Sequence, residues 1–142
     1  MKTYITGPIL VFDIPNANGN VYSREMCQSA LDLKHKINTE SVLGELDNQR
    51  SPNIDLDKVC SKIVDIDINL ENIEATVEVL PTTSGNQLQE MLNEGVEFYL
   101  AARGYGQIDH NNVISNYELI TVDVMPLHCS AGTRTAAKIY QK

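Results

Sequence analysis

Residues 58–80 read KVCSKIVDIDINLENIEATVEVL and carry the strongest structural signal in the sequence. On both sides of a turn near Glu71 and Asn72, apolar residues alternate with polar or acidic ones. A period of two places one row of side chains in a core and the other row in water. The stretch therefore predicts two antiparallel strands joined as a hairpin.

Helical patterns flank this hairpin on both sides. The stretch 23–37 repeats apolar residues at helical spacing, and Ser23 is a residue type that caps helix N-termini. A second helix is expected after the turn 81–85, and Gly95 is placed to close it. Two helices therefore bracket the predicted hairpin.

Further strands are expected at 3–12, 96–102 and 117–124, with another hairpin at 108–114. About seven strands with two to three helices predict an α+β domain whose antiparallel sheet is closed or curled. The 142 residues are enough for a single domain over 1–142, with about 126–142 expected as a polar C-terminal tail.

Charge and composition exclude several classes of function. Nineteen acidic residues against eleven basic ones leave a net charge of -8, and lysine and arginine do not cluster. Binding to nucleic acid or to an anionic membrane is therefore not expected. No apolar run is long enough to span a membrane, and the N-terminus lacks a signal-peptide pattern. The sequence predicts a protein of the cytoplasm that can dock on a basic partner surface.

Metal, cofactor and disulfide chemistry find no support in the sequence. Cys27, Cys60 and Cys129 are widely spaced, without a CxxC pair, and are interpreted as reduced apolar fillers. The stretch 65–69 (DIDIN) superficially resembles a calcium loop. It lacks the turn glycine, and Thr76 stands at the twelfth position. We expect no metal site and no cofactor.

Two remaining segments contain residue types that catalyse reactions. His128 and Ser130 lie one residue apart, but neighbours so close in sequence rarely form a nucleophile–base pair. We interpret them as part of a surface loop. Arg103, beside glycines, suits either an oxyanion-binding role or the corner of a sheet. His35 is expected to favour the dipole at the end of the first helix.

Six segments, in order along the chain, resemble the prohead proteases of tailed bacteriophages. The resemblance implies a fold related to the herpesvirus assemblins, that is, a closed or curled antiparallel β-barrel of about seven strands with two to three flanking helices. Proteins of this family are serine endopeptidases that trim scaffold and capsid proteins. The segments are 18–23 (NGNVYS), 44–47 (GELD), 59–63 (VCSKI), 80–85 (LPTTSG), 101–106 (AARGYG) and 123–126 (DVMP).

The sequence departs from the family where the resemblance places catalysis. Asn48 stands at the position of the general-base histidine, and Ala101 and Ala102 stand at the two serine positions. An alanine methyl cannot attack a carbonyl, and an amide cannot relay a proton near neutral pH. The resemblance thus implies no working catalytic residue. The surrounding frame is kept: Gly44, Glu45, Asp47, Arg103, Gly104, Gly106 and Asp123.

The resemblance favours a catalytically inactive homologue that serves as a phage head protein. It would be made in the host cytoplasm and reside in the virion as an auxiliary, decorating or scaffold-associated component. Its expected partners are the major capsid protein or other head proteins, with a possible oligomer within the capsid. The alternative is an active maturation endopeptidase whose site is rearranged around His128 and Ser130, or mutated in this sequence. A soluble accessory domain without a virion role is a third reading.

Overall fold

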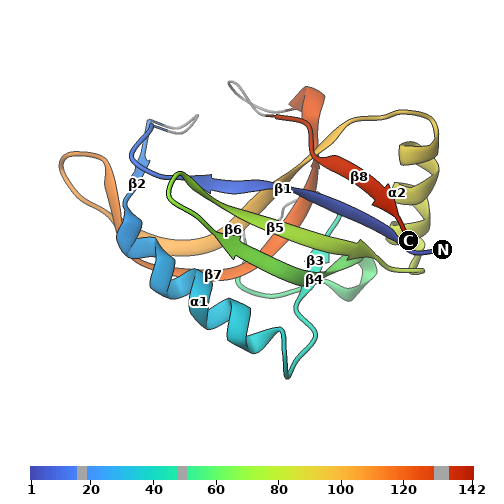
Figure 1. The fold of residues 1–142 in the computed structure, drawn as a ribbon, viewed down its shortest axis with the longest axis horizontal. Helices are drawn as coiled ribbons and strands as arrows, with labels where there is room; N and C mark the ends of the chain where they lie inside the picture. The colour runs from blue at the N-terminus through green and yellow to red at the C-terminus, as the bar shows by residue number, and fades with distance from the viewer. Residues whose placement is uncertain (16–18, 48–50, 130–134) are drawn as a thin grey trace.

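The computed structural model describes residues 1–15, 19–47, 51–129 and 135–142. In this part of the chain, two α-helices and eight strands form an α+β fold with two sheets (Figure 1). No helix among these residues is both long and apolar enough to cross a membrane.

The larger sheet has five strands in the order β3-β4-β5-β1-β8, and every neighbouring pair in it is antiparallel. The predicted hairpin at 58–80 is confirmed and forms the middle of this sheet. Its strands shift register between Ile63 and Asp65, which leaves Val64 38% exposed although it belongs to the apolar row. The strands are β1 (Thr3–Val11), β3 (Leu43–Glu45), β4 (Val59–Ile68), β5 (Asn72–Val79) and β8 (Lys138–Gln141).

The smaller sheet has three strands in the order β2-β7-β6. The two long strands, β6 and β7, form an antiparallel hairpin, as expected at 108–114, while the short β2 pairs with β7 in parallel. Positive φ angles at Asn112 and Asn116 mark the turn and a local irregularity of β7. The strands are β2 (Val21–Tyr22), β6 (Phe98–Ile108) and β7 (Val113–Pro126).

Both predicted helices form, with different starting signals. In α2 (Thr83–Asn93) the Thr82 side chain accepts a hydrogen bond from the Gly85 N–H at 2.9 Å, and Gly95 has a φ of 82° just beyond the helix. The prediction that Ser23 caps the first helix is wrong. Ser23 makes no side-chain cap bond and precedes a 3₁₀ turn, η1 (Arg24–Met26), from which α1 (Cys27–Lys36) continues.

The expected closed antiparallel barrel is not found in the described residues. Two isolated bridges, Phe12 with Tyr22 and Leu46 with Val124, connect the two sheets. Each bridge is followed by an aspartate with positive φ, 60° at Asp13 and 74° at Asp47, which takes the chain out of the extended conformation. The bridges therefore do not lengthen into ladders that would close a barrel.

The core lies between the two sheets and extends under α1. Side chains such as Ile5 and Val77 from the larger sheet and Leu100 from the smaller one are at most 1% exposed. The prediction of a polar C-terminal tail over 126–142 misses β8, which pairs with β1 from Thr3 to Thr6 and stacks Tyr140 on Tyr4. The sequence signal was weak because all four β8 residues are exposed.

Candidate functional site

The two alanines at the family's serine positions lie on opposite faces of the β6–β7 hairpin. Ala101 pairs with Asp123 and Ala102 with Val122. Because directly opposed residues point to the same side of a sheet, Ala101 shares a face with Asp123, whereas Ala102 faces the apolar core. Only the position of Ala101 is therefore next to charged groups.

A buried ionic triad occupies the face on which Ala101 lies. The Arg103 guanidinium donates from Nε to Asp123 Oδ2 at 2.8 Å and from Nη2 to Asp123 Oδ1 at 2.7 Å. Its Nη2 also lies 3.2 Å from Glu45 Oε2. The side chains of Glu45 and Asp123 are fully buried, and that of Arg103 is 3% exposed. The bidentate geometry is the strongest form of this ion pair.

The remaining donors of Arg103 bind the segment 51–53. Nη1 donates to the carbonyls of Ser51 and Asn53, each at 3.2 Å. Glu45 Oε2 accepts the Asp55 N–H at 3.0 Å, which holds the chain just after this segment. All five N–H donors of the guanidinium thus have acceptors. The oxyanion-binding role considered for Arg103 has no free donor to serve it.

Burial and charge act against each other within the triad. Burial raises the pKa of the Asp123 carboxyl, and the hydrogen bonds from Arg103 and from the Glu45 N–H offset only part of this. Burial alone would lower the pKa of Arg103, but the hydrogen bond and charge of Asp123, together with Glu45, raise it. Arg103 therefore stays charged and holds the two acids together.

Gly44 lets β3 reach β7 and so brings Glu45 to the triad. A Cβ atom at Gly44 would lie 2.1 Å from the Val122 carbonyl oxygen, well inside contact distance. The next N–H, that of Glu45, donates to Asp123 Oδ1 at 3.0 Å. Gly104 also has no room for a side chain, because a Cβ there would lie 2.4 Å from the Glu118 carbonyl oxygen. Both glycines are required by close packing.

The segment that carries the family's histidine position runs along the other side of β7. Leu46 forms a bridge with Val124, and the Asp47 N–H donates to the Val124 carbonyl at 2.9 Å. Asn48 itself lies outside the described residues. The two segments that the resemblance assigns to catalysis thus flank the same stretch of β7, residues 122–124.

Three other potential nucleophiles lie near the triad. Burial raises the pKa of the Cys60 thiol to about 12, which keeps it protonated near neutral pH. Thr121 Oγ1 donates to the Leu43 carbonyl at 2.6 Å. Ser61 is fully buried, and its Oγ has no hydrogen-bond partner among the described residues. None of the three is accessible, since all are at most 1% exposed.

The three histidines and the other residue types that could carry chemistry are dispersed over the fold. His35 lies in the last turn of α1, His110 in the β6–β7 turn, and His128 in the 3₁₀ turn η3 (Leu127–Cys129). Ser130, the proposed neighbour of His128, lies outside the described residues. Asp65 and Asp67 point into solvent from β4, and no cluster of potential metal ligands occurs in the described part of the chain.

The fold matches a solved phage protease. The structure of the bacteriophage T4 capsid assembly protease, gp21, aligns with a TM-score of 0.78 and 22% sequence identity. The alignment covers 86% of this chain and 80% of that chain. The chain matches no protein-family model and no curated protein sequence. The likeness establishes a capsid-protease fold, as the sequence motifs had indicated.

The sequence identified the members of the triad but not the contacts among them. Glu45, Arg103 and Asp123 all belong to the frame identified by the resemblance, but nothing in the sequence predicts that they contact one another, because Glu45 and Asp123 are separated by 78 positions. A charged residue between two apolar ones, such as Asp123 between Val122 and Val124, was the one available sign of a buried partner.

Proposed function

We propose that this chain is a catalytically inactive relative of the prohead proteases that serves as a structural component of a phage head. One observation carries the proposal: alanines stand at both positions where the resemblance expects serine, and one of them, Ala101, lies opposite Asp123 beside the buried triad. The fold around this position matches the T4 capsid assembly protease. The residues that surround this position in the family are present, but a methyl group stands where the resemblance expects a hydroxyl.

The chemistry of peptide-bond cleavage supports this proposal. A serine protease needs a hydroxyl that attacks the carbonyl and a base that accepts its proton. Ala101 and Ala102 supply neither, and an asparagine at position 48 cannot exchange a proton near neutral pH. The nearest hydroxyls and the Cys60 thiol are buried. A substrate segment that binds such a domain is held without being cut.

The proposed partners are the major capsid protein or another head protein. A protease fold already has a surface shaped for an extended segment, and main-chain contacts can hold that segment without chemistry. The net charge of -8 favours a partner with a basic surface. In this role the protein resides in the virion as an auxiliary, decorating or scaffold-associated component.

Composition of purified particles tests the structural role. We expect this polypeptide to copurify with mature heads at a fixed stoichiometry and to leave candidate head proteins intact after prolonged incubation. Its absence from purified particles by mass spectrometry would contradict the structural role and favour an accessory domain without a place in the virion.

A serine-reactive fluorophosphonate probe tests the inactivity. We expect no specific labelling of the native protein, with the heat-denatured protein as the background control. Labelling at Ser130 or any other serine would overturn the proposal in favour of an active maturation endopeptidase with a rearranged site. The double variant Ala101→Ser with Asn48→His then shows whether the frame supports cleavage once both groups are supplied.

A further inference from the structure

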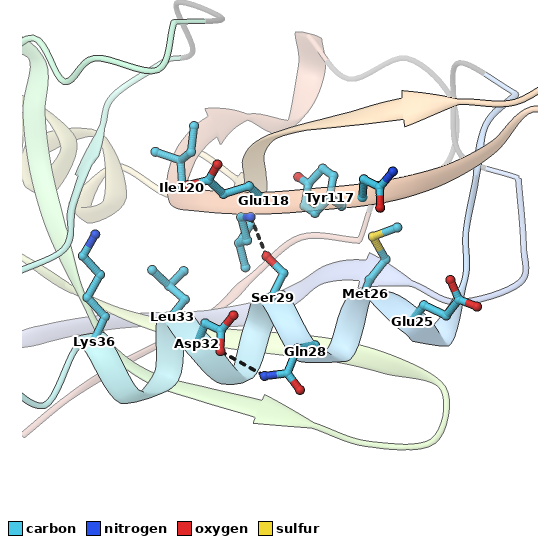
Figure 2. Close-up of a pocket in the computed structure, with 12 residues that line it drawn as sticks. Glu25, Met26, Gln28, Ser29, Asp32, Leu33, Lys36, Tyr117, Glu118 and Ile120 are labelled. Atoms are coloured by element: carbon cyan, nitrogen blue, oxygen red, sulfur yellow. Dashed lines mark hydrogen bonds between the residues drawn. The ribbon is translucent and has the colours of Figure 1, made fainter.

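A groove of about 560 Å³ lies between α1 and β7 (Figure 2), and no residue of the ionic triad lines it. Its floor is apolar: Met26, Leu33 and Leu119 are at most 5% exposed. In Figure 2 the side chains of Met26, Ser29 and Leu33 rise from the helix toward the strand. The walls are polar and come from both elements.

Along this groove, β7 has an edge without a neighbouring strand in the described part of the chain. β2 pairs only with Val113 and Ile114, and the next bridge on this side is at Val124. Between them, the Leu119 N–H donates to Ser29 Oγ of α1 at 2.6 Å. Since Ser29 occupies this donor, an added strand cannot form an unbroken ladder with β7. A bound segment must be held by its side chains.

The charged side chains that line the groove are mainly acidic. Glu25 and Asp32 project from the helical side and Glu118 from β7, and all three are exposed. None of them forms a salt bridge within the described residues; Asp32 accepts only a neutral hydrogen bond, from Gln28 Nε2 at 2.9 Å. The single cation of the groove, Lys36, lies at its far end from Glu25 and pairs with Glu40 at 3.9 Å.

We propose that this groove binds a short extended segment of a partner protein in which lysine or arginine alternates with apolar residues. The apolar side chains of the segment would cover the floor, and its cations would reach the carboxylates of Asp32 and Glu118. This inference rests on the proposed function and adds to it, because it names a second surface, which acts through side-chain contacts, by which the domain holds a head protein. Exposed carboxylates lose little hydration when they pair, so the contact suits reversible docking.

The direct test uses two synthetic peptides of equal length, one of alternating lysine and valine and one of alternating glutamate and valine. We expect the lysine peptide to shift the backbone amide signals of α1 and of residues 115–120 in NMR spectra, and its affinity to fall with added salt. The glutamate peptide is expected to bind at least about tenfold more weakly. Equal binding of both peptides, or shifts confined to other elements, would overturn the proposal.

A charge-matched pair of variants separates the groove from general electrostatics. The double variant Asp32→Lys/Glu118→Lys is expected to weaken binding of the lysine peptide about tenfold. Glu90→Lys/Glu94→Lys makes the same charge change at an exposed position of α2 and at the exposed residue that follows the helix, away from the groove, and is expected to change binding less than about twofold. Equal losses in the two variants would refute a specific groove site.

The same variants distinguish failure of this inference from failure of the proposed function. If wild-type protein copurifies with heads and the groove variant does so equally well, the groove is not the docking site although the structural role stands. If wild-type protein binds the lysine peptide through the groove but is absent from heads, the groove is a peptide site and the head role is wrong.

Discussion

The ionic triad and the two alanines are neighbours at the β6–β7 hairpin, to which β3 brings Glu45, yet the fold constrains them very differently. Arg103 is 3% exposed and has acceptors for every donor, so its removal leaves two buried acids without a counter-charge. Ala101, opposite Asp123, is half-buried, and its methyl group can form neither a hydrogen bond nor an ion pair. The triad is therefore fixed by the fold, whereas the fold does not require alanine at position 101.

This difference changes how the retained motif residues are interpreted. Glu45, Arg103 and the two close-packed glycines, Gly44 and Gly104, each have a structural reason to persist. Their presence therefore indicates the fold and says nothing about activity. Under the proposed function, activity depends instead on positions 101 and 102, where the resemblance expects serine and the sequence has alanine.

The largest effect is expected from Arg103→Met. The variant leaves Glu45 and Asp123 buried without a cation, and breaking a buried ion pair from one side costs about 3–5 kcal/mol. Urea unfolding measures the loss of unfolding free energy, with the exposed Lys138→Met as control. Equal stabilities of the two variants would mean that the triad is not a folding requirement, and the contrast with Ala101 would disappear.

The next largest loss of stability is expected from a substitution at the closely packed Gly44 of β3. Gly44→Ala drives a methyl against the Val122 carbonyl oxygen and is expected to lower the unfolding free energy by about 1–3 kcal/mol. Gly7→Ala is the matched control, because its Cβ would meet Ala137 at an ordinary 3.4 Å. A Gly44→Ala variant as stable as the control would show that β3 can move away from β7 at little cost.

Much of the fold was predictable because its elements are local. The β4–β5 hairpin, β1 and the two helices follow from periodicity and turn residues within short stretches. The division into two sheets was not predictable, because it depends on single residues, Asp13 and Asp47, that adopt positive φ after each connecting bridge. Strand β8 was missed because an exposed edge strand shows no apolar alternation.

The candidate site was predictable in membership but not in geometry. The motifs identified Glu45, Arg103 and both alanines, whereas the sequence could not tell which alanine shares a face with Asp123. That distinction depends on the β6–β7 register, which places Ala101 opposite Asp123 and Ala102 opposite Val122. The groove between α1 and β7 had no sequence signal, since its walls come from elements far apart in the chain.

Serine substitutions at the two alanines sharpen the comparison. Ala101→Ser adds a hydroxyl on the face that carries the charged groups, and we expect a change in unfolding free energy below about 0.5 kcal/mol. Ala102→Ser points its hydroxyl at the apolar core and is expected to cost about 1–3 kcal/mol. Urea unfolding compares the two directly. The reverse order of stabilities would mean that Ala101 faces the core and that Ala102 faces the charged groups.

The smallest expected effect contrasts two aspartates, one in the frame and one at the hairpin tip. Burial raises the pKa of Asp123, whereas hydrogen bonds from the Val113 and Asn111 N–H groups lower the pKa of the exposed Asp109. A lowered pKa in the folded state means that Asp109 stabilises the turn at neutral pH. This contribution is lost as the pH falls through that lowered value.

An NMR titration of the turn tests this prediction. The amide signals of Asn111 and Val113 should move upon acidification with a midpoint below the usual aspartate value of about 3.9. In Asp109→Asn the same signals should not titrate, while the rest of the spectrum stays unchanged. A midpoint at or above the usual value would mean that the two N–H groups do not hold this carboxylate in solution. The hydrogen bonds at the turn would then not explain why the pKa of Asp109 shifts in the opposite direction from that of Asp123.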